Sequence, residues 1–388
     1  MDLNVDLNIY EILAAFGMSV VIAFVFTPIS IKIAHLIGAI DVPRDWRRMH
    51  QRPIPRFGGL AIFVGVMVTL AVLQWDEPKI RVAMLGGALM YLLGVVDDLK
   101  NLPAIVKLIG QTVIAVLMFS MDMRISFIAN YLGEGRLHFN TAICFVVTVL
   151  WIIGITNTIN IIDGLDGLAA GISAIAALCI AYIAYIHGGI AGMPIVCIAM
   201  VAIAGSCIGF LPFNFSPAKT FMGDGGALFL GFMIAILSVV GPLKRSTMIA
   251  VVVPVVVLAI PIFDTSFAIL RRMVNRKPIM GADKEHLHHR LMAYGYGQRR
   301  TVIMLYGISA IMGMSAVLIS RELYKDAVVL ALIAGAYLYV FLTDPNHKMP
   351  RIKAVNIAQE EKKAHFKNDG TKFSEEHDAK EKQNVPCE

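Results

Sequence analysis

Five short polar clusters follow apolar stretches of this chain, and they contain residue types that can hold a metal ion or a phosphate group. One cluster pairs Asp97 with Asp98 at the end of an apolar stretch, and Lys107 follows nine residues after the pair. Two adjacent carboxylates repel each other, and they are costly to bury at a membrane boundary. We therefore expect a cation to lie beside them, supplied by the protein or by the solution.

A second cluster repeats amide and carboxylate groups at a regular spacing. Asn157, Asn160, Asp163 and Asp166 recur every three residues, which predicts that they lie roughly along one stripe of a helix. A single residue of this kind at a helix end is a common cap. Four of them in register favour hydrogen bonding to a polar ligand or to a cation.

The cluster from Phe221 to Gly226 places Asp224 between glycines, just before another apolar run. Alone, this pattern fits a turn followed by a helix cap equally well. Considered together with Asp97 and Asp98, it favours a divalent cation. Oxygen ligands without an accompanying cysteine cluster are typical of Mg²⁺ or Mn²⁺ rather than zinc.

Two further clusters are basic. One contains Arg56, the last of five arginines, and is followed by a pair of glycines; the other contains His286, His288, His289 and Arg290. Arginine binds phosphate oxygens in a bidentate manner, and histidine can donate to them as well. Three histidines this close could also bind a transition metal, so both alternatives stay open.

The elements that must position these clusters are membrane helices. A mean hydropathy of +0.70 with only 16% charged residues excludes an ordinary soluble globular protein. Apolar runs near the length that crosses a bilayer recur along the chain and predict an all-α, polytopic membrane protein with about eleven spans. Ten or twelve spans would fit the pattern too. The expected spans lie near residues 9–37, 57–74, 80–96, 104–121, 141–159, 167–187, 192–211, 226–242, 248–271, 302–320 and 326–343.

The basic residues predict the orientation of these spans. The odd-numbered connections hold sixteen Lys and Arg and the even-numbered ones hold eight, which predicts a cytoplasmic C-terminus and an N-terminus outside. All five polar clusters fall on the odd side, so we expect one site open to the cytoplasm. We expect residues 1–345 to form a transmembrane domain that carries this site, and the charged residues 346–388 to form a largely disordered cytoplasmic tail.

The clusters, taken in order, resemble the motifs of a known family. Asp97-Asp98, the asparagine–aspartate repeat, Phe221-Met-Gly-Asp224 and His286-Leu-His-His-Arg290 are similar to those of the polyprenyl-phosphate N-acetylhexosamine-1-phosphate transferases, relatives of the enzyme that makes lipid I. The resemblance covers nearly all of residues 5–345. It implies a bacterial plasma-membrane enzyme that transfers a sugar 1-phosphate from a UDP-sugar to a polyprenyl phosphate, with Mg²⁺ as the cofactor and UMP as the product.

The resemblance also implies roles for the acidic residues. Asp97 and Asp98 match the catalytic aspartate pair of the family, the first of which is proposed there to deprotonate the lipid phosphate. Asp224 matches the principal metal ligand, and we expect Asp98 to share the metal. Asn160 and Asp163 match residues that line the catalytic centre.

The remaining matches concern substrate binding. Asp166 and Phe221 match positions that contact the uracil ring, and Lys107 matches a lysine near the phosphates. The cluster 286–290 would contact the sugar or its diphosphate. Arg56 stands where relatives carry lysine or other residues, so its substrate contact is an expectation without a direct match.

The substrate and the class of protein have alternatives. The histidine–arginine cluster is similar to that of the subgroup that uses UDP-N-acetylglucosamine to initiate teichoic acid, O-antigen or related glycans. The same reaction with another UDP-N-acetylhexosamine, or with UDP-MurNAc-pentapeptide, is the first alternative. An ion-coupled transporter is a distant one, because such sites lie near the bilayer midplane, where only Asp264 is expected. We expect no nucleic-acid partner, and the family resemblance raises a homodimer as an assembly to test.

Overall fold

The structure, a computed structural model, describes residues 8–42, 53–125, 127–129, 136–138, 140–188, 193–240, 254–256, 258–274, 291–292 and 296–343. The predicted cluster of His286, His288, His289 and Arg290 lies outside the described residues, and so does the predicted tail 346–388. The expectations for these two segments therefore stay predictions.

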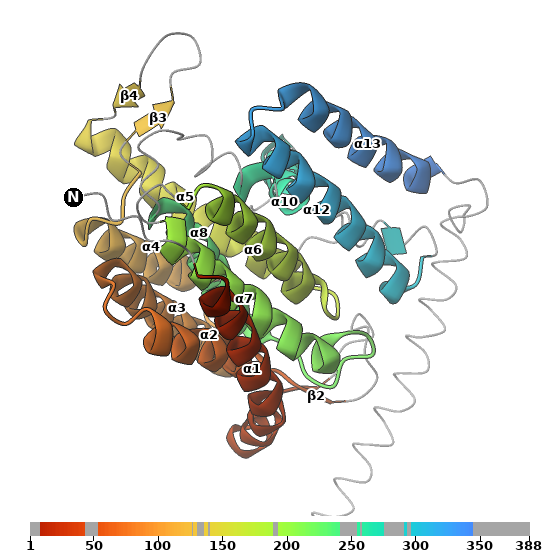
Figure 1. Cartoon of the computed structure of the whole chain (residues 1–388). Helices are drawn as coiled ribbons and strands as arrows, with labels where there is room; N and C mark the ends of the chain where they lie inside the picture. The colour runs from red at the N-terminus through yellow and green to blue at the C-terminus, as the bar shows by residue number, and fades with distance from the viewer. Residues whose placement is uncertain are drawn as a thin grey trace, which may run out of the picture.

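The described part of the chain is almost entirely helical, which confirms the all-α class (Figure 1). Its helices are α1 (Ile9–Ile37), α2 (Gly59–Leu73), α3 (Pro78–Lys100), α4 (Ala104–Ser120), α5 (Thr141–Ile162), α6 (Leu168–Ile186), α7 (Met193–Asn214), α8 (Gly223–Val240), α10 (Ala259–Val274), α12 (Gln298–Ser320) and α13 (Tyr324–Thr343). Two small antiparallel pairs join them: β1 (Ile40–Asp41) with β2 (Ile54–Pro55), and β3 (Phe127–Ala129) with β4 (Arg136–His138). Ile40 lies opposite Pro55 in the first pair, and Ile128 lies opposite Leu137 in the second.

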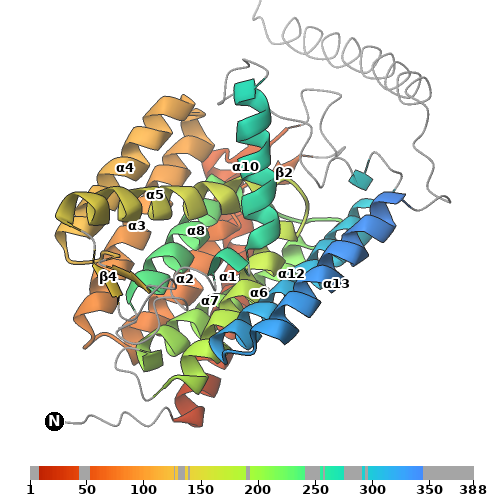
Figure 2. The ribbon, with the colours of Figure 1, turned by 90° about the horizontal axis from the view of Figure 1, so that it is seen from above.

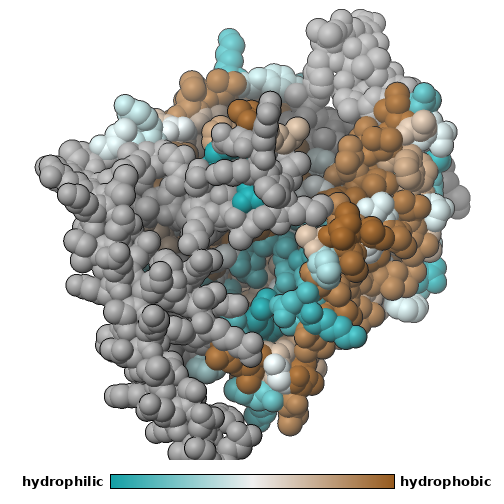
Figure 3. Space-filling model, turned by 180° about the vertical axis from the view of Figure 1, so that it is seen from behind, coloured by the Kyte–Doolittle hydropathy of each residue, from teal (hydrophilic) through white to brown (hydrophobic). Residues whose placement is uncertain are grey.

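Seven of the described helices are long and apolar enough to cross a membrane: α1, α3, α5, α6, α7, α12 and α13. The helices α2, α4 and α8 are apolar but shorter. These helices confirm a polytopic α-helical membrane protein, while the count of eleven spans and the orientation stay predictions. The outer surface agrees with a lipid environment, because apolar side chains cover a broad part of it (Figure 3). Leu332 and Tyr339 of α13, for example, are 68% and 67% exposed.

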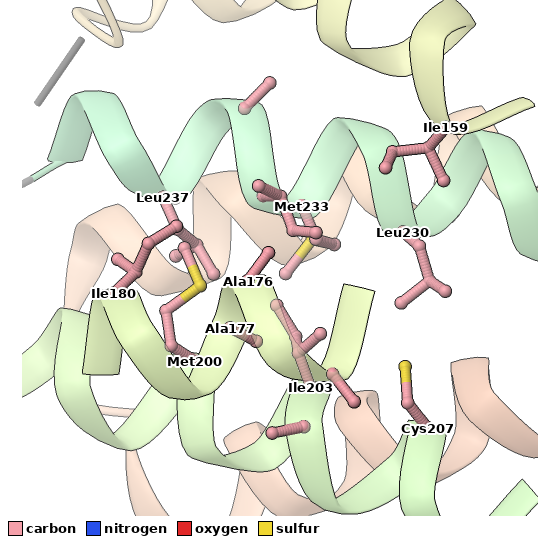
Figure 4. Close-up of a cluster of buried hydrophobic side chains, with 14 of the residues drawn as sticks. Ile159, Ala176, Ala177, Ile180, Met200, Ile203, Cys207, Leu230, Met233 and Leu237 are labelled. Atoms are coloured by element: carbon pink, nitrogen blue, oxygen red, sulfur yellow. The ribbon is translucent and has the colours of Figure 1, made fainter. Parts of the chain in front are cut away.

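Helix α8 lies inside the bundle, where it packs against α3, α5 and α7 (Figure 2). Its side chains from Ala227 to Leu237 are buried on every face. A helix that is apolar all round requires such a position. Figure 4 shows Leu230, Met233 and Leu237 of α8 packed among side chains of α5, α6 and α7. The start of α8, which carries Asp224, therefore belongs to a tightly held element.

The ends of α2, α3 and α8 approach one another at backbone contact. A Cβ atom added at Gly94 of α3 would lie 2.5 Å from the Cα atom of Gly225 and 2.5 Å from the carbonyl oxygen of Asp224. A Cβ at Gly59 of α2 would overlap the backbone of Gly226. Only glycine allows such an approach. This contact brings three of the polar clusters to one end of the bundle.

Candidate functional site

Asp97 and Asp98 are neighbours in sequence, but their carboxylates have different partners. The Oδ2 atom of Asp97 lies 2.7 Å from Nζ of Lys107, and its Oδ1 atom accepts a hydrogen bond of 2.8 Å from the backbone N–H of Leu102. The second bond supports the turn after α3, where Asn101 adopts a left-handed conformation with φ of 48°. This turn reverses the chain within a few residues, so that Lys107 on α4 returns to the aspartate pair.

The carboxylate of Asp98 faces the start of α8 instead. Its Oδ1 and Oδ2 atoms accept hydrogen bonds of 3.0 Å each from the backbone N–H groups of Asp224 and Gly225. The Nη2 atom of Arg56 lies 3.3 Å from Oδ1, and the Asp98 side chain is only 2% exposed. The helix N-terminus and the guanidinium both stabilise a negative charge. Within the described residues, Arg56 is thus the cationic partner of Asp98, and Lys107 is that of Asp97.

Lys107 stands at the centre of the site. Its Nζ atom donates to Oδ1 of Asp224 at 3.0 Å and to Oδ1 of Asn160 at 3.2 Å, in addition to its contact with Asp97. Asn160 in turn donates from Nδ2 to the same oxygen of Asp224. Helices α3, α4, α5 and α8 each contribute one member of this network. The convergence of Asp97, Lys107, Asn160 and Asp224 is therefore a property of the folded bundle.

A pair of amides supports this network one turn deeper. Nδ2 of Asn157 donates to Oε1 of Gln111 at 2.6 Å, and Nε2 of Gln111 donates back to Oδ1 of Asn157 at 3.3 Å. Gln111 is fully buried, and it lies four residues after Lys107 on α4. Sequence reasoning missed Gln111, although a glutamine one turn beyond a lysine in an apolar run was the available signal.

The expectation of one helical stripe from Asn157 to Asp166 is wrong in its second half. Helix α5 ends at Ile162, so Asp163 occupies the position after its last turn and Asp166 lies beyond it. The chain then turns at Gly167, which has a φ of 83°. The Oδ2 atom of Asp166 accepts a hydrogen bond of 3.0 Å from the backbone N–H of Ala218. Asp166 is thereby turned away from the α5 stripe toward the loop that precedes α8.

Asp163 is partly buried beside the network. Withdrawal from water raises the pKa of its carboxyl group well above the ordinary value, and the charges of Asp224 and Asp98 raise that pKa further. Among the described residues, no group donates a hydrogen bond to this carboxylate. Arg56 lowers this pKa through its charge, but among the described residues the Asp163 carboxylate has no direct ion pair or hydrogen bond of the kind that Asp97, Asp98 and Asp224 have.

Three loops around the site are tied together by Asn214, at the end of α7. Its Oδ1 atom accepts from the N–H of Gly167 at 3.1 Å, and its Nδ2 atom donates to the carbonyl of Thr220 at 2.9 Å. The Thr220 hydroxyl and the Phe221 N–H both donate to the carbonyl of Pro55. Asn214 and Thr220 are buried, and sequence reasoning missed both because each looks like an ordinary residue at the end of an apolar run. They hold Phe221 and the Asp166 loop in a fixed relation.

The residues present fit a magnesium ion with the coordination that is usual in proteins. The Oδ2 atom of Asp224 lies 3.8 Å from Nη2 of Arg56, which is too long for a hydrogen bond, and the side chain is 24% exposed. The part of the chain that the structure describes contains no group of three His, Cys, Asp or Glu residues arranged to hold a metal. Mg²⁺ commonly takes only one or two protein carboxylates and completes its shell with water and substrate phosphates. Asp224 meets that requirement as one carboxylate ligand, and Asp163 lies within electrostatic reach of it.

The structure therefore gathers most of the predicted site residues at one end of the bundle. Arg56, Asp97, Asp98, Lys107, Asn160 and Asp224 are joined by direct contacts, and Asp163 lies within electrostatic reach of them. Asp166 and Phe221 lie on the adjoining loops that Asn214 connects. The catalytic and binding roles assigned to these residues stay predictions.

Comparison with known proteins gives a consistent result. Residues 80–242 match the family model described as glycosyl transferase family 4. The chain is 42% identical over 315 residues to a Bacillus subtilis protein named "Probable undecaprenyl-phosphate N-acetylglucosaminyl 1-phosphate transferase". This alignment covers 81% of this chain and 86% of that protein. It is 34% identical to a decaprenyl-phosphate N-acetylglucosaminephosphotransferase of Mycobacterium tuberculosis, over 76% of this chain and 79% of the relative. A Thermotoga maritima undecaprenyl-phosphate alpha-N-acetylglucosaminyl 1-phosphate transferase is 30% identical, over 74% and 84% respectively.

Proposed function

Because the chain belongs to glycosyl transferase family 4, we propose that it transfers N-acetylglucosamine 1-phosphate from UDP-N-acetylglucosamine to a polyprenyl phosphate and releases UMP. The observation that carries this proposal is the convergence of Asp97, Lys107, Asn160 and Asp224 from four different helices. Phosphoryl transfer needs exact positioning and charge stabilisation more than it needs covalent protein chemistry, and this network supplies both. The names of the relatives agree on N-acetylglucosamine and differ in the polyprenyl chain.

The protein is a multi-pass membrane protein, and we propose that the site opens to the cytoplasm of a bacterium. In this arrangement eleven helices span the membrane, the N-terminus lies outside and the C-terminus lies inside. Residues 1–345 form the catalytic domain, and residues 346–388 form a charged tail. The excess of Lys and Arg in the odd-numbered connections supports the orientation. Initiation of a cell-envelope glycan such as teichoic acid is the pathway that this topology would serve.

The nucleotide is recognised, in this proposal, by Asp166 and Phe221. Asp166 uses Oδ2 to accept from the Ala218 N–H, which leaves Oδ1 to accept the imide N–H of uracil. Phe221 stacks on the base. The cluster 286–290 contacts the sugar or its diphosphate, and Arg56 lies where its guanidinium can reach a phosphate oxygen.

A Mg²⁺ ion bound to Asp224 and Asp163 would neutralise charge on the diphosphate and on the departing UMP. Lys107 contributes a positive charge at the same place, because its ammonium group already touches Asp224. Mn²⁺ has the same preference for oxygen ligands and is expected to substitute.

The transfer itself is a single in-line displacement. An oxygen of the lipid phosphate attacks the β-phosphorus, which carries the sugar, and the bond from that phosphorus to the bridging oxygen breaks. The electron pair leaves with UMP. A phosphate monoester has a second pKa of about 6 and is mostly ionised at neutral pH, so a general base is not required. Asp97 instead holds Lys107 in place, as the 2.7 Å contact between them indicates.

The test is UMP release by purified protein with undecaprenyl phosphate, Mg²⁺ and a panel of UDP-sugars that includes UDP-MurNAc-pentapeptide. We expect release that depends on lipid and on Mg²⁺, with UDP-N-acetylglucosamine preferred, and loss of release in Asp224→Ala. Preference for a different UDP-sugar would correct the substrate. If folded protein releases no UMP with any of the UDP-sugars, the transferase activity is excluded. Ion-coupled transport is then the alternative function to test.

A further inference from the structure

We propose that Asp98 is a positioning residue: its carboxylate caps the first turn of α8 and thereby fixes the direction in which Asp224 points. The family resemblance assigns Asp98 to catalysis and to the metal. The contacts of Asp98 in the structure favour a different role. The cap is argued from geometry alone, and only its expected effect on activity rests on the proposed function.

Both carboxylate oxygens of Asp98 are used by the backbone of α8. The first N–H groups of a helix have no partner within the helix and need one from elsewhere. Here the N–H groups of Asp224 and Gly225 donate to Oδ1 and Oδ2 of Asp98, each at 3.0 Å. The cap is unusual because it comes from the end of another helix, α3, rather than from the residue before α8. The ionised form of this carboxyl group also suits the positive end of the helix dipole.

The surrounding backbone leaves no room for an ion between Asp98 and α8. Gly223, at the start of α8, has a φ of 74°, and a Cβ there would lie 2.7 Å from Oδ2 of Asp98 and 2.7 Å from the carbonyl oxygen of Arg56. One turn earlier on α3, Gly94 packs against the backbone of Asp224 and Gly225. The Asp98 side chain is 2% exposed. A metal placed between Asp98 and α8 would have to replace these hydrogen bonds and separate two helices that are in backbone contact.

The cap matters for the reaction because it holds Asp224 from one side while other groups hold it from the opposite side. Asp98 binds the main-chain N–H of Asp224, whereas Lys107 and Asn160 bind its carboxylate. The direction of that carboxylate is therefore fixed at both ends. Of the two adjacent aspartates, Asp97 orients the lysine and Asp98 orients the helix that carries the metal ligand.

The experiment has a structural arm that does not depend on activity. Hydrogen–deuterium exchange of the segment 221–228 is measured by mass spectrometry on full-length protein in detergent without substrate. We expect faster exchange in Asp98→Ala by roughly two- to thirtyfold at the capped amides, the factor that corresponds to the usual free energy of a helix N-cap. Asp98→Asn keeps one acceptor oxygen and should show a smaller increase. Asp97→Asn is the matched control, because its carboxylate does not touch α8, and exchange in 221–228 should stay as in the wild type.

The kinetic arm measures UMP release for the same proteins. We expect kcat of Asp98→Ala to fall about tenfold or more, with the Asn variant between it and the wild type, and the KM for UDP-N-acetylglucosamine to change less than about twofold. The backbone groups of Gly167 and Thr220 are held by Asn214 and not by Asp98, so we expect the KM to change less than kcat. Unchanged exchange in Asp98→Ala, or faster exchange with unchanged kcat, would overturn the proposal. If wild-type protein releases no UMP, the proposed function fails, while the exchange arm still decides whether Asp98 caps α8.

Discussion

Gln111 of α4 and Asn157 of α5 exchange two hydrogen bonds between their side-chain amides, one turn deeper in the bundle than the contact between Lys107 and Asn160. The two contacts lie one helical turn apart between the same two helices. The contact between Lys107 and Asn160 carries the charge of the site, and the pair of amides holds the two helices in a fixed rotation. We therefore expect the contact between Lys107 and Asp224 to depend on this neutral pair.

Replacing Gln111 alone should destabilise the protein more than replacing both amides. Gln111→Leu leaves the Oδ1 atom of Asn157 without its donor, while Nδ2 keeps its hydrogen bond to the carbonyl of Ile153, and this loss costs about 1 kcal/mol within a membrane bundle. We expect a lower Tm and slower UMP release. The double variant Gln111→Leu/Asn157→Leu removes the unpaired group and should recover part of the Tm. Thermal unfolding in detergent gives the Tm of the single and the double variant. Equal Tm values for the single variant and the wild type would contradict a stabilising role of the pair Gln111 and Asn157.

Lys107→Met should abolish most activity while leaving the fold intact. The change removes the positive charge that Asp97 and Asp224 share, and loss of one such stabilising group commonly costs about 100-fold or more in kcat. Lys100→Met, on the exposed last turn of α3, is the control with the same change of residue. Rates of UMP release compare the two. Near wild-type activity of Lys107→Met would remove Lys107 from the catalytic centre.

Asp166→Asn should alter the choice of nucleotide base. The loop should persist, because an asparagine oxygen can still accept from the Ala218 N–H. The group facing the base then becomes a donor, which suits the N3 acceptor of cytosine instead of the N3–H of uracil. We expect inhibition by UMP to weaken about tenfold or more, and inhibition by CMP to strengthen relative to it. Unchanged inhibition constants for both nucleotides would place the uracil elsewhere.

Two glycines in apolar helices should respond oppositely to alanine. At Gly171 of α6 an added Cβ would overlap the ring of Tyr306, whose hydroxyl donates to the carbonyl of Gly167. We expect Gly171→Ala to destabilise by about 1–3 kcal/mol and to raise the KM for the UDP-sugar, because the Gly167 loop is displaced. Gly154 of α5 has no heavy atom within 4 Å of such a Cβ.

Gly154→Ala should therefore be neutral or stabilising by about 0.5–1 kcal/mol, as for other helical glycines. Chemical or thermal unfolding of the two variants gives the comparison. A similar loss of stability in both would mean that the packing of Tyr306 against α6 is not the cause.

Much of the helical framework could be predicted, because ten of the eleven expected apolar runs coincide with a described helix, and an apolar run must form a helix to satisfy its backbone in lipid. The run 248–271 is described only in part, where it overlaps α10. The gathering of the described clusters at one end of the bundle was also predicted, because all of them fall in odd-numbered connections between the expected spans. The end of α5 was missed because its last polar residues continue the three-residue spacing, and only the turn at Gly167 breaks it. The hydrogen-bond partners of Asp98 could not be predicted from the sequence either. They depend on backbone contact between α3 and α8, which no local pattern encodes.

The hydrogen bonds that Asp98 accepts from α8 join residues that are 126 and 127 positions apart in the chain. During synthesis the N-terminal helices are made first, so α3 is complete long before its partner emerges. Until then Asp98 must remain hydrated at the membrane boundary, because an unpaired charge in hydrocarbon is costly. Docking of α8 supplies the missing N–H groups and delivers Asp224 to Lys107 in the same event. Maturation of the site is therefore a late step of biogenesis, and a nascent chain that stops before Gly225 holds the aspartate pair without the helix that completes it.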